Sequence, residues 1–436
     1  MVAGLVGAVT TVIAGNSHVL WYFISHGGLD GYWYADATRL IHNTIHEFPG
    51  YSFVVADLHG HVLGLPVVLL FILTFLSWLS HRTVIFEALM GTLFGVMMMT
   101  NTWDVAVYGL LLVVAGLQLV IQDTKNFERL IKSAGIMGLF MGLTAIPWMM
   151  SFVPISNGIK AVVEHSPLWQ LAVLWTGGLA ITVMAVVTEG RGERRWPIRA
   201  QALTIILLII IPELVYAKDI YPDHPRANTM FKLTYQASIM IGLLAGALWG
   251  KLLDRERKIP GFIRGGGVLV AGVILIGTMI FPAVSFPNFY NNFNKYQGLD
   301  GETWLKTELP EKYNVIKYLQ QHRNGKNLVE AVGDSYTHFN AVSIFSGVPT
   351  IEGWRVHEWL WRGGFDGVAA REIEVKTIYE TVHQTMRITL LKKYNVGWIM
   401  VGSDERGMYT VNDAGIKKLG EVVYENGETY LVKVKE

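Results

Sequence analysis

The chain has 436 residues, of which 51% are hydrophobic and only 16% are charged, whereas a typical soluble protein carries about 25% charged residues. Its formal net charge of +1 gives no excess of basic groups for phosphate backbones, so we expect no nucleic-acid partner. The chain contains no cysteine, which excludes disulfides and thiolate metal sites.

Blocks of apolar sequence follow one another from the N-terminus to about Ala283. They predict an α-helical multi-pass membrane protein with about nine spans, since a spanning helix needs about 20 apolar residues. We therefore expect a transmembrane domain over residues 1–286. The expected spans are Val2–Ile24 (weak near Gly15), His59–Leu79, Val84–Thr100, Val105–Ile121, Ala134–Phe152, Trp169–Val187, Ala200–Tyr216, Phe231–Leu252 and Gly267–Val284.

Basic residues are concentrated in every second loop between these spans. Cytoplasmic loops carry an excess of Lys and Arg, so we expect a plasma-membrane protein whose N-terminus is cytoplasmic and whose tail is outside. The basic loops contain Arg82, Lys125–Lys132, Arg191–Arg199 and Lys251–Arg264.

The tail, residues 287–436, alternates between helical and strand patterns, which predicts a small extracytoplasmic α/β domain. Its last stretch, EVVYENGETYLVKV, is typical of a β-hairpin. We expect Asn426 and Gly427 to form a type I′ turn, in which both central residues have positive φ.

The most polar stretch at a membrane boundary runs from His46 to Pro66, HEFPGYSFVVADLHGHVLGLP. It places Asp57, His59 and His61 directly before a long apolar run. Ionisable groups are costly at membrane depth, so such a cluster indicates a functional site. Glu47 is either a second carboxylate of this site or a solvated loop charge.

An acid beside imidazoles can accept a proton or bind a divalent metal or a phosphate. Asp57, with Glu47 as the alternate, is our candidate catalytic base. Asp57, His59 and His61 are the candidate ligands of a divalent metal such as Mg²⁺ or Mn²⁺, and the two histidines are also candidate substrate-binding residues. The structural alternative is that Asp57 caps the next helix and the histidines lie at the membrane interface.

Two further motifs fall on the side of the membrane predicted to be external. Asp104, in Asn-Thr-Trp-Asp, is a third candidate catalytic acid, although the preceding residues also fit a helix cap and an aromatic belt. Glu213 is a candidate substrate-binding residue that lies within an apolar run, where a buried acid is normally paired. Arg226 is its candidate partner, or else a bidentate ligand for a substrate phosphate.

The tail contains EGWRVHEWLWRG, which is dense in tryptophan, charge and glycine. Its aromatic residues could anchor the tail at the membrane surface. Alternatively, Arg355, His357 or Arg362 reaches the substrate.

Four motifs, HEFPGYSFVVADLHGH, NTWD, PELVYAKD with RANTMFK, and EGWRVHEWLWRG, resemble a family of predicted membrane proteins of archaea and Chloroflexi. That family is named for a Tyr-Tyr-Tyr motif and is a domain of unknown function, DUF2298. It is grouped with the C-type (GT-C) glycosyltransferases, so the resemblance implies a GT-C-like fold, an external active site and a polyprenyl-phosphate-linked sugar donor.

The chain departs from that family in two ways. Family members extend further at the N-terminus, so we expect a fragment, a short form, or half of a split gene whose partner chain carries the missing helices. Gly60 also stands where the family pattern has proline.

The resemblance favours a membrane glycosyltransferase, in which Arg226, with His59 or a metal, stabilises the leaving phosphate. The alternatives are a transporter or flippase for a lipid-linked substrate, and a non-catalytic subunit of a split glycosyltransferase.

Overall fold

The computed structural model describes residues 1–152, 158–189, 196–218, 224–254, 256–257, 259–294, 296, 298–361 and 364–435. The chain divides into two compact units, Met1–Lys295 and Tyr296–Glu436, called here the N-terminal and the C-terminal unit. The long helix α13 (Gly261–Phe289) belongs to the first unit and continues through Pro287.

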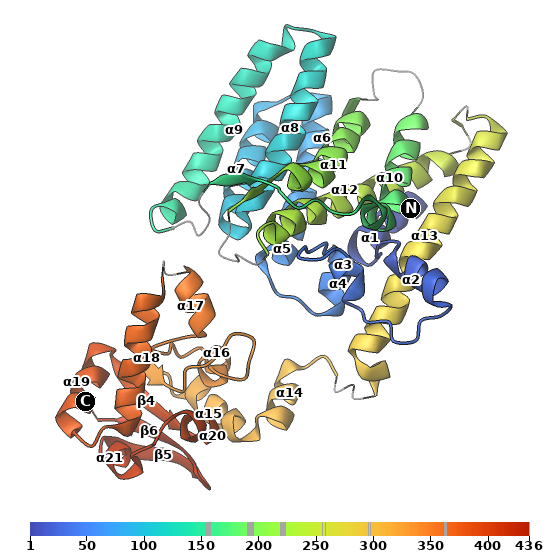
Figure 1. Cartoon of the computed structure of the whole chain (residues 1–436). Helices are drawn as coiled ribbons and strands as arrows, with labels where there is room; N and C mark the ends of the chain where they lie inside the picture. The colour runs from blue at the N-terminus through green and yellow to red at the C-terminus, as the bar shows by residue number, and fades with distance from the viewer. Residues whose placement is uncertain are drawn as a thin grey trace. The chain divides into compact units, whose positions relative to one another are not determined.

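The N-terminal unit is built from helices (Figure 1). Besides α13, its elements are α1 (Val2–Val12), α2 (His18–His26), α3 (Asp36–Arg39), α4 (Pro49–Val54), α5 (Gly60–Leu63), α6 (Leu65–His81), α7 (Val84–Thr100), α8 (Thr102–Gln122), α9 (Asn126–Met149), β1 (Ile159–Ala161), α10 (Leu168–Val187), α11 (Trp196–Leu214), β2 (Val215–Ala217), α12 (Ala227–Leu253) and η2 (Asn291–Phe293).

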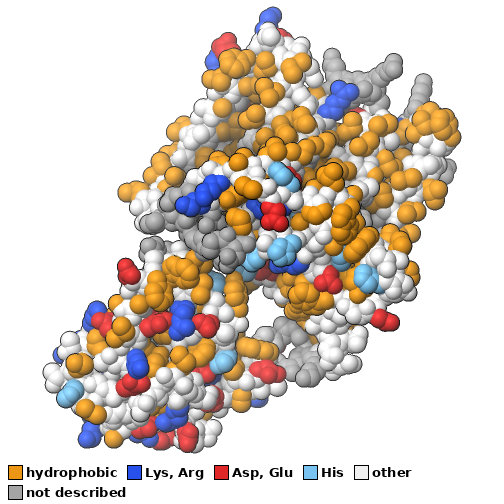
Figure 2. Space-filling model, in the orientation of Figure 1, with side chains coloured by type: hydrophobic (Ala, Val, Ile, Leu, Met, Phe, Trp, Pro, Cys, Tyr) orange, Lys and Arg blue, Asp and Glu red, His pale blue; other side chains and the backbone are white. Residues whose placement is uncertain are grey.

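Seven helices in the described part of the chain are long and apolar enough to cross a membrane, and this supports the predicted multi-pass helical class. Figure 2 shows hydrophobic side chains over the surface of these helices. Exposed examples are Leu73, Leu139 and Ile276. Large apolar side chains on the outside of a helix bundle are suited to lipid contact rather than to water. The apolar helices α1 and α7 are shorter.

The expected first span is interrupted. Helix α1 ends at Val12 and α2 begins at His18. The Oδ1 atom of Asn16 accepts a hydrogen bond from the backbone N–H of His18, at 3.0 Å. A Cβ atom at Gly15 would lie 2.3 Å from the Cβ of Phe281, so the chain at the break runs directly against α13.

The central helix of the N-terminal unit is α12, which packs against α1, α8, α10, α11 and α13. Its close approach to α1 depends on glycine. A Cβ atom at Gly246 would lie 2.8 Å from both the carbonyl oxygen of Ala3 and the Cα of Gly7. Small residues let helix backbones approach closely in membrane proteins, and α12 thereby becomes the common wall of the sites described below.

The C-terminal unit contains a four-stranded sheet of order β3-β4-β6-β5. Strands β3 and β4 are parallel, whereas the β4/β6 and β6/β5 pairs are antiparallel. Its elements are α14 (Gly301–Glu308), α15 (Pro310–Gln321), β3 (Asn327–Val329), α16 (Ala341–Ser346), α17 (Arg355–Trp361), α18 (Phe365–Glu380), α19 (Gln384–Lys393), β4 (Val396–Val401), α20 (Ser403–Met408), α21 (Asp413–Lys417), β5 (Gly420–Asn426) and β6 (Thr429–Val434).

The predicted hairpin is present, but the predicted turn type is wrong. Asn426 pairs with Thr429, so the turn consists of Gly427 and Glu428. Gly427 has φ 60°, whereas Asn426 and Glu428 do not have positive φ. A hairpin turn with glycine first and only that residue at positive φ is of type II′. Asn426 is still part of strand β5.

Candidate functional site

The segment that carries the site is shaped by two glycines. Pro49 begins α4, and a Cβ atom at Gly50 would lie 2.4 Å from the carbonyl oxygen of Ile13. At the start of α5, a Cβ atom at Gly60 would lie 2.4 Å from the carbonyl oxygen of Thr100. These contacts hold the segment against the ends of α1 and α7. Proline also has a Cβ atom, so this backbone requires glycine at position 60, where the family pattern has proline.

Asp57 is held between two histidines. Its Oδ1 atom bonds Nδ1 of His59, and its Oδ2 atom lies 3.2 Å from Nε2 of His61. Burial raises the pKa of Asp57, but the hydrogen bonds from His61 and His59 outweigh it and leave the pKa below its usual value. Asp57 is therefore a carboxylate at neutral pH.

Because a carboxylate only accepts hydrogen bonds, the tautomers that fit are protonated at Nδ1 of His59 and at Nε2 of His61. The side chain of His59 is 51% exposed, whereas that of His61 is 3% exposed. One oxygen of Asp57 is therefore bonded to an imidazole that reaches solvent, and the other faces an imidazole that is buried.

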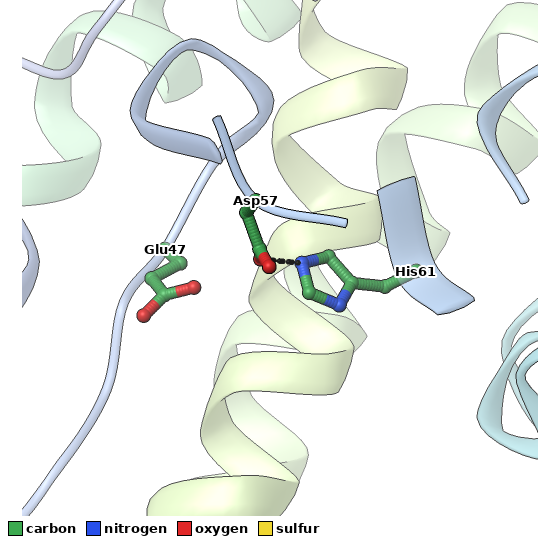
Figure 3. A group of neighbouring side chains, drawn as sticks. All are labelled: Glu47, Asp57 and His61. Atoms are coloured by element: carbon green, nitrogen blue, oxygen red, sulfur yellow. Dashed lines mark ion pairs between the residues drawn. The ribbon is translucent and has the colours of Figure 1, made fainter. Parts of the chain in front are cut away.

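Glu47 joins this group from the extended segment before α4. One carboxylate oxygen of Glu47, one of Asp57 and a ring nitrogen of His61 all lie within 4.8 Å of one another, which is close enough to hold a metal ion (Figure 3). Glu47 Oε1 also accepts a hydrogen bond from Arg39 Nη2, at 2.8 Å. The structure therefore brings together Glu47, Asp57 and His61, while His59 bonds Oδ1 of Asp57. These four residues are called the Asp57 group.

Helix α12 forms the wall behind His61. The rings of Phe231 and Tyr235 meet the His61 ring edge-on, with centroid distances of 4.7 and 4.8 Å. The Tyr235 hydroxyl donates to Ser52 Oγ at 3.4 Å. The Nζ atom of Lys232 lies 4.4 Å from the centroid of the Phe231 ring. Neither Tyr235 nor Ser52 was a candidate from sequence: Tyr235 lies in the apolar helix α12, and Ser52 is an uncharged residue of the His46–Pro66 stretch.

Asp104 lies in a separate buried network. Its Oδ1 atom accepts hydrogen bonds from Asn101 Nδ2 at 2.8 Å and from Gln236 Nε2 at 2.7 Å. The Tyr108 hydroxyl donates to Gln236 Oε1 at 2.8 Å. Asp104 is 1% exposed. Its hydrogen bond with Gln236 links α8 to α12. Its catalytic role stays a prediction.

Glu213 and Arg226 form a paired cluster with Ser166. Arg226 Nη1 donates to Glu213 Oε2 at 2.7 Å, and Arg226 Nη2 donates to Ser166 Oγ at 3.1 Å. The backbone N–H of Ser166 donates to Glu213 Oε2 at 2.9 Å. This buried arrangement corresponds to the structural alternative left open by the sequence. Ser166 had no sequence signal, since it stands far from both partners along the chain.

The tail candidates belong to the C-terminal unit, so their place relative to Asp57 stays a prediction. Arg355 is paired with Glu372 at 2.7 Å and with Asp334 at 3.1 Å. The Nδ1 atom of His357 lies 2.7 Å from Ser335 Oγ. Arg362 lies outside the described residues.

Residues 1–211 match the model of a family described as an uncharacterized membrane protein, DUF2298. This match confirms the resemblance for the part of the chain that holds the Asp57 group and Asp104. The motifs that begin at Pro212 and in the tail lie beyond the matched residues. No curated protein matches the chain.

His46 is a buried histidine that sequence reasoning did not single out. Neither ring nitrogen has a hydrogen-bond partner among the residues that the structure describes. Burial lowers its pKa to about 3, the carboxylate of Glu213 opposes this, and Arg226 and Arg39 add to it. His46 is therefore neutral at physiological pH.

We predict that His46 makes the fold sensitive to mild acid. The unfolded chain takes up a proton near the ordinary histidine pKa of about 6.5, which folded His46 does not bind until about pH 3. Stability from this group is fully present above pH ~6.5 and falls below it, by up to about 1.4 kcal/mol per pH unit. Replacing His46→Phe should reduce the loss of thermal stability between pH 7.5 and 5, measured on purified protein in detergent. The control His42→Phe, at an exposed position, should keep the wild-type slope. Equal slopes for His46→Phe and wild type would contradict the assignment.

Proposed function

We propose that this membrane protein, whose residues 1–211 match the model of the family DUF2298, transfers a sugar from a polyprenyl-phosphate-linked donor to an acceptor hydroxyl. The observation that carries the proposal is the Asp57 carboxylate, held by two imidazoles beside Glu47 and directly before the span that begins at Gly60. A lipid-linked donor diffuses in the bilayer and presents its head group at the same interface.

In this proposal Asp57 accepts the proton of the acceptor hydroxyl as that oxygen attacks the sugar. A positioned general base contributes roughly 10²–10⁴-fold to a rate. Because its pKa is lowered, Asp57 is ionised at neutral pH and able to accept a proton. The two imidazole N–H groups fix the direction of its oxygens. Glu47, held by Arg39, is the alternate base.

The carboxylates of Glu47 and Asp57 fit a divalent cation together with the imidazole of His61, in a state where the ring nitrogen that faces the cation carries no proton. Carboxylates suit Mg²⁺ and Mn²⁺, and an imidazole ligand favours Mn²⁺ over Mg²⁺. A cation bound there would supply positive charge for a phosphate leaving group.

Cationic side chains of the N-terminal unit would stabilise the phosphate further. Arg226 is the candidate named from sequence, but its guanidinium already binds Glu213 and Ser166. Its phosphate role therefore requires the substrate to replace part of that pairing. His59, the alternative named with a bound metal, is bonded to Asp57 and its side chain is 51% exposed. Asp104, Arg355, His357 and Arg362 stay as further candidates in the proposal.

The distribution of basic residues favours one orientation in the membrane. The C-terminal unit lies outside the plasma membrane and the loop between α8 and α9 lies in the cytoplasm, because basic residues flank that loop. A single cysteine at Lys125→Cys and one at Asn426→Cys should therefore react with an impermeant maleimide from opposite sides of the membrane. The chain has no cysteine of its own, so the background is the unaltered protein. Labelling of both positions from the same side of the membrane would refute the proposed topology.

The base role of Asp57 is tested by Asp57→Asn, which keeps the shape of the side chain and removes its charge. We expect sugar release from a panel of radiolabelled polyprenyl-phosphate hexoses to fall ~100-fold or more, with the melting temperature kept within a few degrees. The matched control is Glu128→Gln, which removes a carboxylate exposed on α9 and paired with Lys132.

Full transfer by Asp57→Asn would refute the base role. If wild-type protein binds the donor but transfers no sugar, with the acceptors and any partner chain present, the protein is better explained as a transporter of the lipid-linked substrate than as an enzyme.

A further inference from the structure

The C-terminal unit has a pocket of about 420 Å³ between α16 and α17. Small-molecule sites have volumes of about 300–1,000 Å³, and a cavity of about 150 Å³ already holds one benzene ring. A six-membered ring with its substituents therefore fits this pocket. The described residues that line it include Asn340, Ser343, Ile344, Trp354, His357 and Glu358.

The pocket lies where parallel segments of the sheet end. Strand β3 runs parallel to β4, and Leu328 of β3 also forms a parallel bridge with Thr350. Helix α16 follows β3 along the chain, and Trp354 follows the bridge at Thr350. In open α/β sheets, ligands bind outside the carboxyl ends of the parallel strands. The topology thus gives this pocket the position of a ligand site.

One wall of the pocket is an indole ring that its neighbours hold in place. Trp354 Nε1 donates a hydrogen bond to the carbonyl oxygen of Phe339, at 2.9 Å. The rings of Tyr336 and His357 lie against the indole, with centroid distances of 5.7 and 5.5 Å. Because Nε1 is already bonded, the indole offers a ligand its apolar surface. A surface that is fixed in advance loses little freedom when a ligand binds.

Two residues beside the pocket have their backbone in the left-handed region. Tyr336 has φ 61° and Asn340 has φ 60°. Positive φ is uncommon for residues other than glycine, and for a bulky residue such as tyrosine it is an outlier. Strained backbone of this kind clusters at ligand sites, where the surrounding structure maintains it. Here it accompanies the contact of the Tyr336 ring with Trp354 and the place of Asn340 at the start of α16.

The polar side chains of the pocket match hydroxyl groups. Asn340 is 4% exposed, and its Nδ2 atom donates to the carbonyl oxygen of Glu352 at 3.1 Å. Its Oδ1 atom is buried and has no hydrogen-bond partner among the residues that the structure describes. The carboxylate of Glu358 accepts hydrogen bonds, and the ring of His357 donates or accepts them. A ligand with several hydroxyls, each both donor and acceptor, is suited to all three side chains.

The charges around the pocket favour an uncharged ligand. No Lys or Arg is among the described residues that line it. Arg371 of α18 lies 3.1 Å from a carboxylate oxygen of Glu352 and 3.8 Å from one of Glu358. A phosphate in the pocket would therefore meet the Glu358 carboxylate without a cation of its own, and like charges side by side are unfavourable. A cationic ligand gains little, because Arg371 already balances Glu358.

We propose that this pocket binds a neutral saccharide. The C–H face of a pyranose ring stacks on Trp354, and its hydroxyls form hydrogen bonds with Asn340, His357 and Glu358. A wholly apolar ligand would cover these polar groups without bonding to them, which is costly. The inference goes beyond the proposed transfer reaction and does not depend on it, since the Asp57 group takes no part in this site.

The test is an array of immobilised neutral glycans, read with the full-length protein in a polyoxyethylene detergent, because maltoside detergents are themselves saccharides. The best-bound glycan is then titrated as a free oligosaccharide. Trp354→Ala removes the stacking surface and should weaken binding ~10-fold or more, as for a central aromatic anchor. The matched control is Trp359→Ala, which removes a tryptophan of the same helix α17 that is 38% exposed and outside the described lining. It should bind as wild type does.

A second variant guards against loss of the fold in Trp354→Ala. Glu358→Gln keeps the shape of the side chain and removes its charge, so binding should fall about ten-fold through a weaker hydrogen bond to a sugar hydroxyl. The melting temperature should stay near that of wild type, because the pair with Arg371 is long and partly exposed. The matched control is Glu425→Gln, on strand β5, where Glu425 pairs with Lys417.

Asp57→Asn should bind the glycan as tightly as wild type, so a failure of the transfer reaction would leave the saccharide site intact. Wild-type affinity in both Trp354→Ala and Glu358→Gln would overturn the proposal. So would the absence of binding by wild-type protein to every neutral glycan of the array.

Discussion

The pairing of one carboxylate with two imidazole N–H groups is the interaction around which the candidate site is organised. Burying the Asp57 carboxylate without partners would cost free energy. Hydrogen bonds from His59 and His61 keep it ionised directly before the span formed by α5 and α6. The segment that carries this pairing lies between two close backbone contacts, at Gly50 in α4 and at Gly60 in α5, where no side chain fits. The chemistry proposed for the site therefore rests on backbone packing at the ends of α1 and α7.

Much of the helical framework could be predicted from hydropathy. Helix α7 has the expected bounds, Val84–Thr100, and α12 exceeds its expected span by a few residues at its start. The order of Asp57, His59 and His61 also indicated their contact, because polar groups beside an apolar run have few other partners. The interruption of the first span was visible only as a weak point near Gly15.

Contacts between distant segments could not be predicted in the same way. Ser166 completes the Glu213–Arg226 cluster, and Tyr235 and Ser52 border His61, yet none of these residues carries a sequence signal for that place. His46 stands in the same polar stretch as Asp57 but its ring lies near that of Trp175 in α10, since the side of an extended segment depends on what packs against it. The turn at Gly427 shows the same limit at short range, because the residue pair Asn-Gly does not fix which residue begins the turn.

The claim that the Asp57 group is the functional centre is tested most directly by a cryo-EM structure of the chain in nanodiscs with a polyprenyl-phosphate sugar. If Asp57 acts there, head-group density should lie beside Asp57 and Glu47, with a polar ligand atom within about 2.6–3.2 Å of a carboxylate oxygen, or bridged to it by a cation. Head-group density elsewhere, with the contacts of Asp57 to His59 and His61 unchanged, would contradict it.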